Sequence, residues 1–149
     1  MKFSTRSDTK ASIEVAYAAF TDFDRFEYRL QRKDIEITRV PDIEAVEVGC
    51  RWHGQFSWRG RTYKAETELV SLDKPQGVAL ETLCRGVVCL GVIDLLALPE
   101  GGTRIFVSID LKPTTLASRL LVQSLRFAKP RLTSKLESRV ADFAMEIGH

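Results

Sequence analysis

The 149-residue chain is predicted to form a single α+β domain, residues 1–149, in which a curved antiparallel sheet of six or seven strands wraps around a long C-terminal helix. Two observations predict this fold class. Apolar and polar residues alternate through much of the segment from 35 to 111, which is typical of strands with one buried face. After about residue 115 the apolar period lengthens to that of an amphipathic helix. The apolar face of the sheet can then be covered by the apolar stripe of the helix.

A strand and two short helices are expected at the N-terminus. Residues 2–10 are mostly polar and predict a strand at a sheet edge. Ser12 is the expected N-cap of a first helix, because a serine side chain can accept a hydrogen bond from the first turn. The apolar stripe of this helix is predicted to be Val15, Ala16, Ala19 and Phe20. A second helix is expected around DRFEYRLQR, with Phe23, Phe26 and Leu30 on one side.

Strands follow, and one hairpin can be paired residue by residue. After the half-buried strand DIEITRV, an Arg59-Gly60 loop would pair Trp58 with Arg61 and Phe56 with Tyr63. Because side chains alternate along a strand, His53 then lies on the polar face. The opposite face is nearly all apolar, with Cys50, Trp52, Gly54, Phe56 and Trp58.

The last strands are GVALETLC and the pair VVCLGVIDLLAL and TRIFVSIDL, joined by PEGG. Pairing Leu98 with Thr103 places Asp94 opposite Val107, on the apolar face. The first strand of this pair is apolar on both sides, so alternation alone does not set its register.

The C-terminal helix has an apolar residue at every third or fourth position. Pro130 cannot donate a backbone hydrogen bond, so a kink or break is expected near Ala128. The predicted stripe is Leu121, Leu125, Ala128, Leu132, Leu136, Val140, Phe143 and Ile147.

Composition excludes several functional classes. A net charge of +2 is too small to predict nucleic-acid binding. His53 is isolated, and no H-x-x-H or C-x-x-C spacing occurs, so no metal site and no cofactor are expected. The longest apolar run is interrupted by Asp94, which predicts a buried strand and no membrane span. Three unpaired cysteines and the polar N-terminus favour a reduced, cytoplasmic setting without a secretory signal.

The order of elements resembles the START-like, or helix-grip, superfamily, which includes polyketide cyclases/dehydrases and lipid-transport proteins. SIEVAYAAFTDFDRF, VGCRW, RGRTYKAETELVSLDKPQGVAL and LLALPEGGTRIFVSIDL carry the resemblance, together with the terminal helix. The resemblance implies an apolar cavity between the sheet and the helix. The leading hypothesis is therefore a protein that binds or transports a lipid, polyketide or quinone-like molecule.

The candidate ligand-binding residues are mostly aromatic. They are Trp52, Phe56, Trp58 and Tyr63 on the sheet, Phe20, Phe26 and Phe127 at the entrance, and Leu132 on the helix. Core packing would also account for these rings, because each buries a large apolar area.

An enzyme is the first alternative. A carboxyl group in an apolar cavity holds its proton more tightly and can transfer it. Asp94 is the candidate acid, with Tyr63 as its hydrogen-bonding partner, and the reaction class is that of a cyclase or dehydratase. In the competing interpretation, Asp94 lies at a bulge facing solvent or pairs with an arginine.

A protein-interaction module is the second alternative. From Lys112 to Arg139 the chain has seven basic residues and one acid, Glu137. Such a helix could meet anionic lipid headgroups or ribosomal RNA, giving peripheral membrane contact. The cations are spread around the helix, which favours a solvated face. The chain is expected to be a monomer or a weak homodimer.

Overall fold

The computed structural model describes residues 1–149 and has the predicted architecture, with seven strands and four helices. In chain order the elements are β1 (Lys2–Thr9), α1 (Ile13–Phe20), α2 (Phe23–Gln31), β2 (Glu36–Val40), β3 (Arg51–Trp58), β4 (Arg61–Asp73), β5 (Gly77–Cys84), β6 (Val87–Ala97), β7 (Thr103–Pro113), α3 (Leu116–Phe127) and α4 (Lys129–Ile147).

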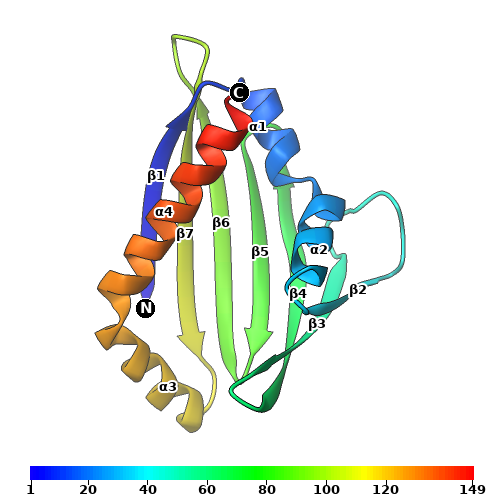
Figure 1. Cartoon of the computed structure of the whole chain (residues 1–149), viewed down its shortest axis with the longest axis vertical. Helices are drawn as coiled ribbons and strands as arrows, with labels where there is room; N and C mark the ends of the chain where they lie inside the picture. The colour runs from blue at the N-terminus through cyan, green and yellow to red at the C-terminus, as the bar shows by residue number, and fades with distance from the viewer.

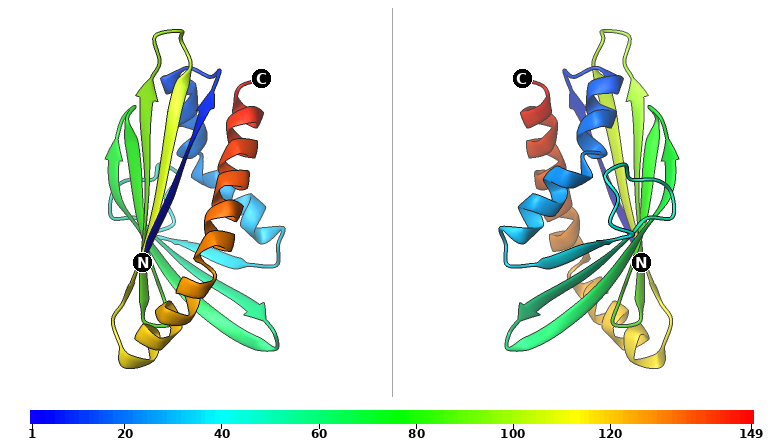
Figure 2. Two further views of the ribbon diagram at one scale, coloured as in Figure 1. Left: turned by 90° about the vertical axis from the view of Figure 1, so that its left-hand side faces the viewer. Right: turned by 90° about the vertical axis from the view of Figure 1, so that its right-hand side faces the viewer.

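All strands form one antiparallel sheet in the order β1-β7-β6-β5-β4-β3-β2. The helices α1, α2 and α4 lie on its concave side, and α3 lies at one end (Figure 1). Seen edge-on, the sheet curls toward the helices, and the β3–β4 hairpin reaches farthest out on that side (Figure 2). The predicted edge position of the N-terminal strand is confirmed.

The β3–β4 hairpin has the predicted register. Trp58 pairs with Arg61, Phe56 with Tyr63 and Trp52 with Thr67. Arg59 and Gly60 both have positive φ, at 49° and 77°, as a two-residue hairpin loop of this type requires.

The β6–β7 hairpin differs from the prediction by one residue. Ala97, not Leu98, pairs with Thr103, so Asp94 lies opposite Phe106. The Leu98 amide donates to the Gly102 carbonyl over 2.8 Å, which leaves a three-residue loop with Gly101 at φ 98°. The predicted four-residue loop was wrong, and this slip moves every β6 side chain to the other face relative to β7.

Helix α1 begins as predicted, because Ser12 caps it by accepting a hydrogen bond from the Val15 amide. Its buried side chains are Ala16, Tyr17 and Phe20. The predicted stripe is therefore corrected at Val15, which is 52% exposed. Tyr17 takes its place because the helix is rotated so that this ring joins the core.

The C-terminal helix breaks at Ala128 into α3 and α4, as Pro130 predicted. Val140 and Ala144 of α4 pack in the core with α1 and the sheet. All eight residues of the predicted stripe are buried or half-buried.

The core fills only one half of the concave side. Its twelve buried residues gather between α1, the C-terminal half of α4 and the sheet. Toward the other end, concave-face residues such as Phe56, Cys89, Ile109 and Leu111 are only half-buried. Only 19 of 149 residues are buried, so the space under the helices is not completely filled by side chains.

Candidate functional site

An apolar cavity of about 330 Å³ lies between α2 and the concave face of the sheet. Five strands, α1 and α2 contribute to its wall, which is hydrophobic at eight of ten positions: Phe20, Phe23, Phe26, Glu27, Leu30, Ile37, Trp52, Thr67, Leu80 and Ile93. A volume in this range suits a small organic molecule.

Aromatic rings of the cavity wall pack against one another and against Phe143. The Phe23 and Trp52 rings are 5.3 Å apart between centroids, and Phe20 lies 4.7 Å from Phe143 of α4. Phe26 is 6.0 Å from the same Phe143 ring. Rings at these distances attract one another in tilted arrangements, so they hold each other in place around the empty volume.

Glu27 is the one charged side chain in the cavity wall. Its Oε1 atom accepts a hydrogen bond from Trp52 Nε1 over 2.7 Å and another from Arg39 Nε over 2.7 Å. Both bonds end on Oε1, so Oε2 keeps its capacity to accept. The carboxylate thus offers one oriented acceptor at the edge of an apolar space.

Arg39 holds the Glu27 carboxylate in place. Its side chain is only 8% exposed, and it also donates to Asp24 Oδ1 over 2.6 Å and to the Ile43 carbonyl over 2.7 Å. Burial alone would lower the Arg39 pKa, but hydrogen bonds to Glu27 and Asp24 outweigh it and raise the pKa above its ordinary value. Arg39 is therefore a fixed positive charge that holds Glu27 in position.

Sequence reasoning missed this polar group. Glu27 stands in a helix rich in charged residues, and no role was predicted for Glu27 or Arg39. In the structure Arg39 pairs with Trp52 and shares the concave face. The available signal was the spacing, because Arg39 is two residues from Ile37 and the alternation puts both on one face.

The predicted ligand-binding residues separate into two groups. Trp52, Phe20 and Phe26 line the cavity. Phe56, Tyr63 and Trp58 form a second aromatic group nearer the hairpin loop, where Phe56 and Tyr63 stack at 5.4 Å. Phe127 is 92% exposed on α3, and Leu132 is half-buried at the start of α4. Neither of these two residues lines the cavity.

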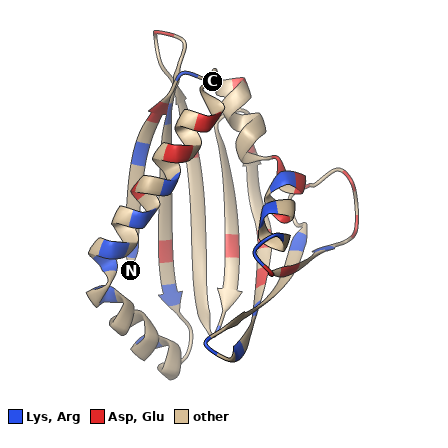
Figure 3. Cartoon of the chain, in the orientation of Figure 1, with Lys and Arg blue, Asp and Glu red and all other residues tan.

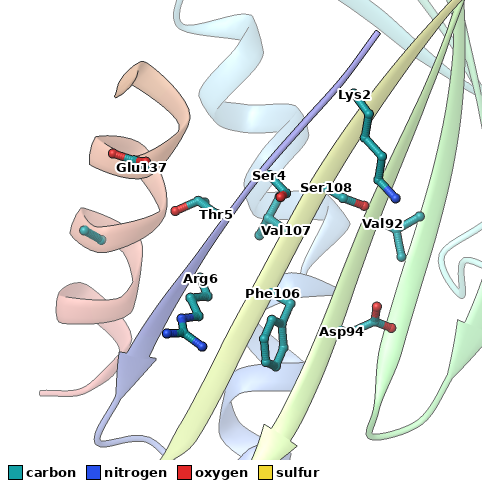
Figure 4. A pocket seen from close by; sticks show the side chains of 11 residues that line it. Lys2, Ser4, Thr5, Arg6, Val92, Asp94, Phe106, Val107, Ser108 and Glu137 are labelled. Carbon is teal, nitrogen blue, oxygen red and sulfur yellow. The ribbon is translucent and has the colours of Figure 1, made fainter. Parts of the chain in front are cut away.

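Asp94 lies outside the cavity, which corrects the predicted position of the candidate acid. Ile93 lines the cavity and Leu95 is in the core, so the side chain between them points to the convex face. Figure 4 shows Asp94 with Phe106 and Arg6 around a wider hollow of about 820 Å³, lined mostly by polar residues. Asp94 is exposed, whereas Tyr63 is on the concave face, so the two do not form a site.

His53 is exposed on the convex face as predicted, with its Nδ1 atom 3.9 Å from Glu66. The three cysteines are free, but only Cys50 is buried, and burial raises the pKa of its thiol. Cys84 and Cys89 are half-buried on the concave face, and burial also raises the pKa of the Cys89 thiol. No group of three or more His, Cys, Asp or Glu side chains is placed to hold a metal ion.

Solved structures of similar shape cover most of the chain. The crystal structure of Ara h 8.0201 matches with a TM-score of 0.59 and 14% identity, over 91% of this chain and 97% of that one. A protein from Rhodobacter sphaeroides matches with a TM-score of 0.55 and 18% identity, over 91% and 88%. An HSP90 activator from Plasmodium falciparum matches with 0.53 and 18%, over 77% and 76%.

No protein-family model and no curated protein sequence matches the chain. None of the helices combines the length and apolar character needed to cross a membrane. The structural likenesses, all at low sequence identity, show the fold. The chain has a Bet v 1-like helix-grip fold.

Proposed function

We propose that this chain binds and carries a small hydrophobic molecule in the cavity under α2, as START-like lipid-transport proteins do. The observation that carries the proposal is the cavity itself, an apolar space of about 330 Å³ with ring-lined walls and one carboxylate. Burying the apolar body of a ligand there would contribute about 25 cal/mol for each Å² removed from water.

Glu27 narrows the chemical class of the ligand. A carboxylate oxygen only accepts hydrogen bonds, so the ligand should carry a hydroxyl, amide or amine donor that reaches Oε2. Trp52 and Arg39 keep Oε1 occupied and fix the direction in which Oε2 points. A lipid, polyketide or quinol-like compound with an apolar body and one donor fits this description.

A cyclase or dehydratase activity is the alternative. An acid–base reaction in this cavity would use Glu27, because Asp94 faces the other side of the sheet. Glu27 already accepts two hydrogen bonds in its role as an anchor, so binding is the function that the geometry supports better.

The first experiment is titration with N-phenyl-1-naphthylamine, an apolar fluorescent probe with one N–H donor, after native mass spectrometry of the purified protein. Gly54 pairs with the cavity residue Ile37, and a Cβ there meets no atom closer than 3.8 Å. The Gly54→Phe variant should therefore fold, fill the space beside Trp52 and lower probe affinity about tenfold or more, through lost apolar burial.

Two control variants lie on the convex face. Gln55→Phe adds a similar volume to the same strand but on the opposite face, and Asp94→Asn removes the excluded acid. Both should bind the probe as the unmodified chain does. Equal affinity in Gly54→Phe and the unmodified protein would sink the proposal. An equal loss of affinity in the two convex-face variants would sink it too, because the loss in Gly54→Phe would then not report on the cavity.

A further inference from the structure

Charge is divided unevenly between the two ends of the molecule. We use the term basic end for residues 57–65, 82–90 and 112–136, which contain ten of the 22 lysines and arginines and none of the 20 acids. The rest of the chain therefore has twelve cations against twenty acids. A net charge of +2 conceals this separation, which is large enough to produce a strong local field.

Strand pairing places these three segments together. Ala65 pairs with Cys84, and Val87 pairs with Pro113, so the β3–β4 loop, the β5–β6 turn and the start of α3 share one end of the sheet. The Thr114 amide and hydroxyl both donate to the Gly86 carbonyl, over 2.8 and 2.7 Å. Figure 3 shows lysine and arginine positions at the hairpin loop and along the first turns of α4, with the acidic positions of α4 farther along the helix.

Helix α3 has two apolar faces, and only one is packed. Ser118 and Val122 are buried against the rest of the molecule. On the opposite side Leu116, Leu120 and Phe127 are 77%, 61% and 92% exposed. These positions fall within one narrow sector of the helix, since their spacings of four and seven return to the same side. We call them the exposed apolar row.

Cations border this row. Arg119 and Arg126 are exposed on the same flank of α3. Lys129 and Arg131 follow at the start of α4, and Arg131 and Lys135 line one hollow together with Arg29 of α2. These last two cations therefore share one face of the helix.

We propose that the basic end docks on an anionic phospholipid bilayer, with the exposed apolar row entering the headgroup region. Long cationic side chains can reach lipid phosphates while leucine and phenylalanine enter the apolar boundary. An RNA backbone would satisfy the cations but would leave the two leucines exposed to water. Membrane docking is a function separate from ligand binding and does not depend on ligand binding. Docking would also bring the less filled half of the concave side close to the membrane.

The test is flotation of the full chain with vesicles of phosphatidylcholine alone or with about one third phosphatidylserine. We expect binding only to the anionic vesicles, and a strong fall when salt rises from about 0.1 M to about 0.5 M, because salt screens the cations. Equal binding to neutral vesicles, or no binding to either kind, would overturn the proposal.

Two double variants separate charge from apolar insertion. Arg126→Glu with Lys129→Glu should lower the partition coefficient about tenfold or more, since each cation near an anionic surface contributes about fivefold. Leu120→Ser with Phe127→Ser removes the apolar side chains without adding charge, and it should lower the partition coefficient to a similar extent. The matched control for charge is Lys10→Glu with Lys74→Glu, two exposed cations outside the basic end. The control for the apolar row is Met145→Ser, at a residue that is 68% exposed near the end of α4.

Both controls should bind like the unmodified chain. An equal loss in the Lys10 and Lys74 pair would show that net charge alone matters and would reject a defined surface. If the unmodified protein does not bind vesicles and the Leu120 and Phe127 double variant still binds a ribosomal RNA fragment, the basic end would be assigned to nucleic-acid binding. Probe titration of the same variants keeps the two proposals apart, because vesicle binding without probe uptake would reject only the cavity function.

Discussion

Glu27 connects three side chains that are far apart in the sequence. Its Oε1 atom is shared by Trp52 and Arg39, whose side chain is almost completely buried. Removing one member of such a group leaves the others with unmet polar atoms, which costs more than the pair itself contributes.

Replacing Glu27 by leucine should therefore lower the free energy of unfolding by about 2 kcal/mol, because Trp52 Nε1 and Arg39 Nε lose their acceptor while Asp24 and Ile43 still hold Arg39. Urea unfolding followed by tryptophan fluorescence measures this change. Gln31→Leu, at the exposed end of the same helix, is the matched control and should change stability little. No loss in Glu27→Leu would mean that water replaces the carboxylate at no cost.

Single residues also show where sequence reasoning reaches its limit. Trp52 and Phe20 were placed on apolar faces because their periodicity is local and unambiguous, and the family resemblance supplied the expectation of a cavity beside those faces. Glu27 could not be placed in the same way, since its role depends on Arg39, which approaches it only after β2 joins the sheet. Phe127, which was predicted at the cavity entrance, is 92% exposed on α3. The helix pattern distinguishes two faces but does not reveal which face meets the protein.

The two hairpins explain why one register was predicted and the other was not. Between β3 and β4, a two-residue loop and a clear polar and apolar alternation agree on one pairing. Between β6 and β7, both faces of β6 are apolar, so either register buries a similar side-chain set. The conformation of Gly101 decides the register, because a three-residue loop needs a residue at positive φ in that position.

Helix α3 depends on the cap formed by Thr115 and Ser118. Ser118 is 1% exposed, and its Oγ accepts from the Thr114 and Thr115 amides over 3.0 and 2.9 Å. Ser118→Ala should therefore speed hydrogen exchange across α3 and lower stability by about 1 kcal/mol. Ser124→Ala, on the exposed side of the same helix, should change neither the hydrogen-exchange rate of α3 nor the stability. Equal exchange in the two variants would show that packing alone holds the helix start.

At the scale of the whole molecule, α2 is the cavity wall that contributes no buried residue to the core. None of its residues is buried, and it is linked to α4 by exposed ion pairs of Arg25 and Arg29 with Glu146. Exposed ion pairs contribute little to stability, so α2 is held mainly by the rings that face the cavity and by the bonds of Glu27 and Asp24 to Arg39 and Trp52.

A bound molecule should therefore stabilise α2 more than any other element. Saturation with N-phenyl-1-naphthylamine should slow hydrogen exchange of the α2 amides severalfold and leave the central strands β6 and β7 unchanged, because the probe adds packing only where it was incomplete. The Gly54→Phe variant should show no such response. Slower exchange in the β3–β4 hairpin without a change in α2 would place the probe at the second aromatic group.

The two outer strands of the sheet have a consequence for self-association. An uncovered strand edge can template pairing with another chain and lead to fibrils. Here α4 lies along β1, and Thr9 Oγ1 donates to the Ala144 carbonyl over 2.7 Å. The other outer strand, β2, has only five residues and stops before Pro41, which lacks an amide hydrogen. The chain can thus keep an incompletely filled interior without exposing a long strand edge on which copies could polymerise.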